Sequence, residues 1–353
     1  MSDMIISGKI TALEPLHIGT GVHIGTYQPT LDYIPARAIR GMLGNYLFSH
    51  NPQLYKELEF KNGHEKIYFR DGVPEGMVHA PSLLRVCKGC GKILGIKNEC
   101  ECGHESKELS GWIKKNFTIG EKVESAEVKK QINTKCPIAK EWHTTYPKGE
   151  GKTPYNVAAI GRGTKFDFRI VVEDKYVQPV KEALQEAGIF YGIGGMRSRG
   201  YGAVLFEFLK EETAEEYMEL RIKTTDENCL LVVNSPVILR DNVGNCVIEI
   251  GNSFEDAAQI SGQRHCFKEE RIVLRTEYAK LRETLVRGWS IENGNKLNEL
   301  YYGIAPGSCV VCKISPLLLA CLEVYGMGEF TNVYGDVYFV ELGKLLDTEE
   351  VKE

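Results

Sequence analysis

The stretch ALQEAGIFYGIGGMRSRGYGAVLFEF, residues 183–208, decides the fold that we expect for this chain. It begins as the end of an amphipathic helix, passes through a glycine-rich loop and becomes an apolar strand at residues 203–208. Five glycines among residues 192–202 let the backbone adopt positive φ and come close to a ligand. Two arginines and a serine in the middle of this loop favour an anionic ligand, because guanidinium groups match the geometry of phosphate oxygens. The simpler alternative is a flexible turn between a helix and a strand.

The same pattern returns near the C-terminus. Residues 325–340, YGMGEFTNVYGDVYFV, repeat Tyr-Gly-x-Gly and then Tyr-Gly-x-Val in the same order, with one residue fewer between them. Each copy follows a helix-like apolar segment, residues 177–187 or 316–324, and precedes a strand. A supersecondary unit that is used twice predicts a duplicated domain. The second copy lacks both arginines, so we expect it to be structural and the first copy to bind the ligand.

Composition and charge indicate a globular protein with two unlike halves. The chain has 353 residues, 43% hydrophobic and 26% charged, which leaves room for two domains. No apolar run of membrane-spanning length and no signal-peptide pattern occur, so we expect a cytoplasmic protein with no membrane partner. Residues 1–210 contain 29 Lys and Arg against 23 Asp and Glu, whereas the remainder contains 14 against 25. This asymmetry predicts an anionic ligand on the first half and a protein neighbour on the second, unless solvated faces differ by chance.

A helix with two arginines near its start is predicted after the first strand. Residues 4–13 form that strand, and Pro35 suits the first turn of the helix. Arg37 and Arg40 lie three residues apart near the amino end, where they oppose the helix dipole. An anion bound nearby would offset this cost, so we include both arginines among the candidate binding residues.

Two cysteine pairs predict a metal site in the polar, lysine-rich segment that follows this helix. The pairs are Cys87-Lys-Gly-Cys90 and Cys100-Glu-Cys102, each followed by glycine and separated by nine residues. This spacing predicts tetrahedral Zn²⁺ bound by Cys87, Cys90, Cys100 and Cys102, with His104 as a substitute for Cys100 or Cys102. Four thiolates leave no open coordination position, so the role of the metal would be structural. The alternative is four reduced cysteines in a loop.

The order of elements predicts an α+β fold. Residues 165–172 form a strand, residues 177–187 a helix, and the glycine loop then leads into its strand. With a further strand expected inside the segment around the cysteines, this is the split βαβ order of ferredoxin-like folds. An apolar strand at residues 228–239 begins a second domain, with residues 244–250 as a hairpin partner. Cys309 and Cys312 form another C-x-x-C, but they lie in an apolar strand and are expected in the core.

Several motifs, taken together and in order, resemble the RAMP superfamily of CRISPR effector proteins. They are LHIGTG at 16–21, YIPARAIRG at 33–41, GRGTKF at 161–166 and the glycine loop at 192–202. Fainter matches follow in SPVILRD at 235–241, in Gly307-Ser308 and in the second glycine loop. Within the superfamily, the chain looks closest to the subunits that cap the 5′ end of the CRISPR RNA (crRNA) in type III-D and type VII complexes.

The resemblance implies two tandem ferredoxin-like (RRM-like) domains. We expect the first at residues 1–210, with an inserted zinc ribbon at about 80–110, and a second, degenerate one at residues 211–353. It also implies a partner, because the glycine loop and the adjoining sheet face would hold crRNA, with phosphates bound by the loop and a base stacked on a tyrosine. The other partners would be effector subunits, especially backbone RAMP proteins. The predicted RNA-binding residues are Arg37, Arg40, Tyr191, Gly194, Arg197, Ser198, Arg199 and Tyr201.

The expected function is non-catalytic binding of the repeat-derived 5′ handle and nucleation of the backbone. The alternatives are a backbone subunit that binds the crRNA spacer, an endoribonuclease that processes precursor crRNA, and a zinc-ribbon adaptor unrelated to CRISPR. A ribonuclease would use His17 or His23, and target cleavage would use Asp32. No tight catalytic constellation accompanies these residues, so we predict no enzymatic activity.

Overall fold

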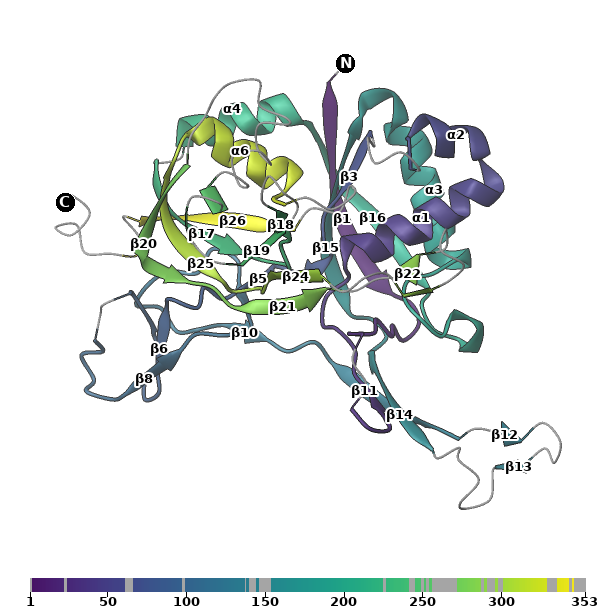
Figure 1. Ribbon diagram of the computed structural model, residues 1–353, viewed down its shortest axis with the longest axis horizontal. Helices are drawn as coiled ribbons and strands as arrows, with labels where there is room; N and C mark the ends of the chain where they lie inside the picture. Colours follow the sequence, from purple (N-terminus) through teal and green to yellow (C-terminus); the bar gives the residue numbers. More distant parts are fainter. Residues whose placement is uncertain are drawn as a thin grey trace.

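The computed structural model has a mixed α+β fold, as the sequence predicts (Figure 1). None of the helices that it describes is long and apolar enough to span a membrane. The described residues are 2–21, 24–60, 66–96, 99–136, 138–139, 144–145, 154–224, 227–240, 245–248, 251, 254–255, 272–286, 289–290, 296–297, 301–328, 335–342 and 345.

The first half of the chain forms a sheet with the strand order expected for a split βαβ unit. Its main strands are β1 (Asp3–Ala12), β3 (Ile67–Phe69), β15 (Lys165–Glu173) and β16 (Val204–Thr213), and the short β4 (Val73–Pro74) also pairs with β15. Their order across the sheet is β16-β1-β15-β3, with antiparallel neighbours throughout, so the fourth strand lies beside the first and the third beside the second. The further strand that was expected in the segment around the cysteines is β3.

Helices α1 (Ala36–His50) and α3 (Val177–Phe190) cover one face of this sheet (Figure 1). Alternate residues of β1, such as Ile6 and Ile10, are buried with the apolar faces of both helices. Ile5 points to the opposite face, where it packs in a separate cluster with residues of the second half. The Asp71 carboxylate accepts a hydrogen bond from the Ala36 amide at the start of α1, so it caps the helix that was predicted to begin after Pro35.

The second half forms a sheet with the same strand order. Its strands are β17 (Asn228–Val233), β20 (Ile272–Lys280), β25 (Cys309–Ile314) and β26 (Val337–Glu341), in the order β20-β25-β17-β26. Read from β26, the sheet contains the fourth, first, third and second of these strands in chain order, as the first sheet does. Helix α6 (Pro316–Tyr325) packs on one face, and α4 (Ala214–Thr224) packs beside α6 (Figure 1). Cys309 and Cys312 are fully buried in β25, which confirms that they are core residues.

The two halves also repeat backbone contacts at the ends of their strands. Gly163 and Gly307, both with positive φ, donate their N–H groups to the residues that end β1 and β17, at 2.8 and 2.7 Å. Two further backbone pairings recur with the same four-residue spacing in each participating segment. They are Ala12–Thr164 and Leu16–Ile160 in the first half, and Val233–Ser308 and Val237–Ile304 in the second.

The remaining strands form small sheets and hairpins. Beside the first sheet, the hairpin of β11 (Lys130–Lys135) and β14 (Tyr155–Ile160) extends away from the body of the molecule (Figure 1). Of the hairpin partner expected at residues 244–250, the described part is β19, which pairs with β18. The other short elements are β2 (Tyr27–Gln28), α2 (Pro52–Glu57), β5 (Met77–His79), β6 (Arg85–Cys87), β7 (Ile93–Leu94), β8 (Ser106–Glu108), β9 (Trp112–Lys114), β10 (Ser125–Ala126), β12 (Ile138–Ala139), β13 (Thr144–Thr145), η1 (Asp174–Tyr176), η2 (Arg197–Arg199), β18 (Leu239–Arg240), β19 (Cys246–Val247), β21 (Glu283–Val286), β22 (Trp289–Ser290), β23 (Lys296–Leu297) and β24 (Tyr301–Ile304).

Candidate functional site

The glycine loop, residues 192–202, needs its glycines because it lies directly against other backbone of the same chain. Gly192 and Gly194 have φ of 63° and 86°. A Cβ at Gly192 would lie 2.7 Å from the Gly202 carbonyl oxygen, and a Cβ at Gly194 would lie 2.5 Å from that of His17. Gly200 differs, since its φ is 78° but the space around its Cβ position is open. The glycines were expected to let the backbone come close to a ligand. At Gly192 and Gly194, the backbone instead comes close to other backbone of the same chain.

The loop and the segment after β1 form one unit. The Gly195 amide donates to the His17 carbonyl at 2.8 Å, and the Gly202 amide donates to the Pro15 carbonyl at 3.0 Å. His17 is 8% exposed, and its Nδ1 donates a hydrogen bond of 2.8 Å to the Ala158 carbonyl oxygen. These bonds give the loop a fixed conformation. The second glycine loop repeats the close approach, because a Cβ at Gly328 would lie 2.5 Å from the Ile238 carbonyl oxygen.

Arg197, Ser198 and Arg199 form the exposed turn η2 at the tip of the glycine loop. The Arg197 Nη1 donates to the Tyr191 carbonyl at 3.1 Å, and the Arg199 Nη1 donates to the Tyr155 hydroxyl at 2.7 Å. Within the described part of the chain, neither guanidinium forms an ion pair with a carboxylate. The turn therefore presents two positioned positive charges with most of their donors directed to solvent.

The two candidate stacking tyrosines have different surroundings. Tyr201 is 7% exposed, and its hydroxyl accepts a hydrogen bond of 2.8 Å from Asn133 of β11. The Lys135 ammonium lies 5.2 Å from the centre of the Tyr201 ring, so β11 covers the ring that was expected to face a base. Tyr191 is half-buried, with its ring edge-on to His50 at a centroid distance of 5.7 Å. The structure thus places Tyr201 underneath the loop and leaves Tyr191 nearer to solvent.

The hairpin β11–β14 contributes contacts to the loop that sequence reasoning missed. Asn133 and Lys135 of β11 and Tyr155 of β14 contact Tyr201 or Arg199. Asn133 and Lys135 lie two residues apart on one face of a strand. This alternation could have predicted that both side chains face the same neighbour. It was hidden in a segment rich in lysine with no clear periodicity.

Arg37 and Arg40 lie on the first turns of α1. The Arg40 Nη2 donates to the Phe60 carbonyl at 2.8 Å, and its guanidinium lies 5.5 Å from the centre of the Phe60 ring. Arg40 is thus directed to the segment after α2. Arg37 is half-buried near the Asp71 carboxylate, whose pKa is raised to about 6 by burial and lowered somewhat by the Arg37 charge.

A cavity of 820 Å³ lies between the two sheets, away from the glycine loop. Arginines line it, but their charges are matched. Arg70, which is 2% exposed, pairs with Asp336, and Arg221 makes two bonds of 2.6 and 2.7 Å to Glu323. The third arginine of the lining, Arg169, donates to the Glu323 carbonyl at 3.0 Å and lies over the Tyr217 ring. Since all three guanidinium groups are held by protein partners, the cavity offers less to a phosphate chain than the glycine loop does.

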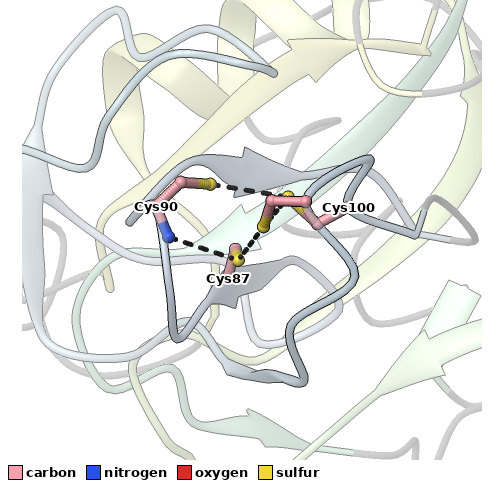
Figure 2. Close-up of side chains that lie close together, drawn as sticks. Cys87, Cys90 and Cys100 are labelled. Carbon is pink, nitrogen blue, oxygen red and sulfur yellow. Dashed lines mark hydrogen bonds between the residues drawn. The ribbon is translucent and has the colours of Figure 1, made fainter.

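The four predicted zinc ligands gather into one cluster. The sulfur atoms of Cys87, Cys90, Cys100 and Cys102 all lie within 4.8 Å of one another, with the closest pairs at 3.0 to 3.4 Å. Figure 2 shows the sulfurs of the three labelled cysteines turned toward one another. Sulfurs bound tetrahedrally to zinc at 2.3 Å would lie about 3.8 Å apart, so this cluster accommodates the ion with small movements. The Cys87 sulfur also accepts the Cys90 amide at 3.5 Å, a bond typical of metal-binding knuckles.

His104 lies beside the cluster without joining it. Its ring packs over Gly89, where an added Cβ would lie 2.5 Å from the ring, and its Nδ1 is 3.1 Å from the Cys102 carbonyl oxygen. The described residues that offer ligand atoms close enough to share one ion are the four cysteines alone. Four soft sulfur donors favour Zn²⁺ over Mg²⁺ or Ca²⁺.

The sequence candidates for catalysis were His17, His23 and Asp32. His23 lies outside the described residues. Asp32 is half-buried before α1, and its charge acts on His79, whose pKa is lowered mainly by burial. His17 is held by a backbone carbonyl, as expected of a packing histidine.

Comparison with known proteins identifies the family. The family model of the RAMP superfamily matches residues 9–205, which is more than half of the chain, so the protein belongs to the RAMP superfamily. This confirms the resemblance carried by the motifs at 16–21, 33–41, 161–166 and 192–202. No curated protein matches the chain by sequence.

Several solved structures are similar to this chain over part or most of its length. An RAMP protein that binds different RNA substrates is 10% identical, with a TM-score of 0.44 over 96% of this chain and 100% of that one. The product of a Cas6-related gene from Pyrococcus furiosus is 11% identical, with a TM-score of 0.42 over 96% and 99%. A chain of the type III-B Cmr-beta complex bound to cognate target RNA is 18% identical, with a TM-score of 0.35 over 60% of this chain and 61% of that chain. This protein therefore spans less than two thirds of the Cmr-beta chain.

Proposed function

We propose that this RAMP protein is a non-catalytic crRNA-binding subunit of a CRISPR interference complex. In this proposal it holds the repeat-derived 5′ handle of the crRNA and nucleates assembly of the backbone subunits. The observation that carries the proposal is the exposed turn Arg197–Arg199, whose two guanidinium groups form no ion pair within the described residues and sit on a loop fixed by backbone bonds.

The sugar-phosphate chain would lie across this turn. Arg197 and Arg199 each use one nitrogen to contact the protein, so their remaining donors would bind phosphate oxygens together with the Ser198 hydroxyl. Gly194 keeps the loop against His17, and Tyr201 supports it from below. Tyr191 would stack on a base beside the loop. Arg37 and Arg40 would flank the RNA path from α1.

We further propose that the chain consists of two tandem ferredoxin-like domains, at residues 1–210 and 211–353. Support comes from the repeated strand order, from the backbone pairings at equivalent strand ends and from the equivalent glycines Gly194 and Gly328. The second domain carries the excess of acidic residues, which suits contact with basic neighbouring subunits such as backbone RAMP proteins.

The metal in our proposal is Zn²⁺, bound by Cys87, Cys90, Cys100 and Cys102 within the ribbon at about 80–110. Its role is structural, since four thiolates complete a tetrahedral shell. The test is metal analysis of the purified protein, with an expected content of one zinc per chain that falls in a Cys100→Ser, Cys102→Ser variant. Zinc at background level in the wild type would contradict this part of the proposal.

The RNA proposal is tested by sequencing the RNA that copurifies with the protein and by measuring binding of its repeat-derived part. Replacing both Arg197 and Arg199 by alanine is expected to weaken binding about 100-fold, because each charge-assisted hydrogen bond to phosphate contributes about 1.5 kcal/mol or more. The slope of log affinity against log salt should fall by about 1.4, as expected for two phosphate contacts to a single strand.

A matched control removes the same charge elsewhere. Lys114 and Lys223 have exposed side chains, 57% and 74% accessible, and lie outside the glycine loop. Their double replacement by alanine is expected to change affinity by less than about threefold, through long-range electrostatics alone. Equal effects of the two double variants, or no effect of either, would refute a specific role of the loop.

A further inference from the structure

The segment that carries the four cysteines packs on the second half of the chain, although it is inserted in the first half. From here on, the ribbon means residues 77–114, which are the zinc ribbon proposed at about 80–110 together with strands β5 and β9, which pair at its two ends. Figure 1 shows its strands β6 and β8 on the side of the second sheet opposite to α6. Buried residues of the ribbon and of the second half form one continuous hydrophobic cluster. From the ribbon these are Val78, Ala80, Leu84, Val86, Ile93, Leu109 and Ile113, and from the second half Leu230, Val232, Cys309, Val311, Leu342 and Leu345.

Alternate residues of the second sheet divide between two layers. In β25, Val310 belongs to the cluster under α6, whereas its neighbour Val311 belongs to the cluster shared with the ribbon. In β17, Leu231 and Leu230 divide in the same way. Both faces of this sheet are therefore buried, one by its own helix and the other by the ribbon.

Polar contacts fix the ribbon at the edges of this shared core. The His79 amide donates to the Asn234 side chain at 2.7 Å, and the Tyr338 hydroxyl donates to the His79 carbonyl at 2.6 Å. Glu108, at the end of β8, forms ion pairs with Lys280 and Arg282 of the second half. The position of the ribbon on the sheet is thus specified by directional bonds as well as by apolar contact.

The cysteine cluster holds the two ends of the apolar ribbon face together. Cys87 ends β6 directly after the core residue Val86, and it pairs across the strands with Ser106 of β8. Cys100 and Cys102 lie in the turn that leads to β8, which in turn carries Glu108 and leads to the core residue Leu109. The ribbon strands have only two or three residues each, so their stability depends on cross-links more than on their own hydrogen bonds.

We propose that metal binding at the four cysteines controls the order of the second half, because the ribbon is the second layer of its sheet. The inference rests on the proposed metal centre. Without the ion, β6 and β8 separate, the ribbon leaves the sheet, and the face formed by Leu230, Val232 and Val311 becomes accessible to water. The first sheet, whose core under α1 and α3 contains no ribbon residue, keeps its structure.

Hydrogen–deuterium exchange of the full chain tests this coupling. Metal content is first measured, and the zinc-bearing protein is then compared before and after treatment with a strong chelator. Amide protection in β17 and β25 is expected to fall by roughly a hundredfold or more, since several buried apolar side chains lose their cover. Protection in β1 and β15 should change by less than about threefold, and adding zinc back should restore the original pattern.

The outcomes separate this inference from the metal centre itself. Protein that contains no metal refutes the metal centre. Protein that contains zinc but shows faster exchange only within residues 85–110 after chelation leaves the metal centre intact and refutes the coupling. Replacing the exposed Cys136 by serine is the control for cysteine loss outside the cluster, and it should leave exchange in β17 and β25 unchanged.

A pair of adjacent valines gives an independent test that leaves the ligands in place. Coupling is reciprocal, so loosening the ribbon from the sheet must also weaken metal binding. Val311→Ala, on the ribbon side, is expected to speed zinc transfer to a chelator about tenfold, whereas Val310→Ala, on the α6 side, should not. Equal rates in the two variants would overturn the inference.

Discussion

Replacing Gly194 by alanine tests whether the glycine loop is held by the chain itself. At this residue φ is 86°, and the added Cβ would lie 2.5 Å from the His17 carbonyl oxygen, a distance at which the backbone must move. The positive φ alone costs an L residue about 1–2 kcal/mol. Relief of the clash must break the bond from the Gly195 amide to the same carbonyl, which adds about 1 kcal/mol or more. We therefore expect a loss of about 2–4 kcal/mol in the free energy of unfolding.

Gly200→Ala is the matched control. Its φ is 78°, but an added Cβ meets nothing within 4 Å, so only the cost of the positive φ, about 1–2 kcal/mol, applies. Urea unfolding, followed by circular dichroism, measures the free energy of unfolding of both variants. RNA binding is measured without urea, where both variants are folded. Gly194→Ala should also weaken RNA binding, because it displaces Arg197 and Arg199. Equal destabilisation by the two substitutions would refute the contact with His17.

Three further predictions concern Asp71, Tyr201 and Tyr191. Burial raises the pKa of Asp71 to about 6 from 3.8, so the folded state binds a proton more readily than the unfolded state does. Stability is then greatest below pH 4 as far as this group is concerned, and it falls by about 3 kcal/mol in total as the pH rises through 6. The free energy of unfolding is measured by urea titration at several pH values between 4 and 7. Asp71→Asn should remove this part of its pH dependence, and an unchanged pH dependence would contradict the prediction. Tyr201→Phe should keep RNA affinity within about twofold while losing about 1 kcal/mol of stability with the Asn133 bond. Tyr191→Ala should weaken RNA binding about tenfold through lost stacking, and a larger effect of the Tyr201 change than of the Tyr191 change would reverse the two roles.

Local patterns predicted much of this structure. The helix after Pro35, the helix before the glycine loop and the strand at 165–172 follow from periodicity, because their apolar faces cover nearby parts of the chain. The strand predicted at 228–239 is correct only over 228–233, since β17 ends at Val233, and Leu239 belongs to β18 of another sheet. Clustering of the four cysteines follows from spacing, since two short knuckles leave few ways to arrange their sulfurs.

Contacts between distant segments could not be predicted in the same way. A glycine that makes room for a ligand and a glycine that makes room for the chain's own backbone cannot be told apart in a sequence. For Gly194, only the short distance to the His17 carbonyl in the structure shows that the second case applies. The burial of Tyr201 depends on Asn133 and Lys135, which come from a hairpin some 70 residues earlier. Nothing in the sequence around Arg40 indicates that its side chain is directed to Phe60.

The shared core of the ribbon and the second sheet has a consequence during synthesis. Ile113 leaves the ribosome long before Val311 and Leu342, with which it is buried. At about 5–20 residues per second, the apolar ribbon face would wait roughly 10–45 s for its partner strands. During that interval the nascent chain exposes an apolar surface that a chaperone would cover. Expressing residues 1–210 as a separate fragment would make the same exposure permanent, so such a fragment should aggregate unless the ribbon is removed.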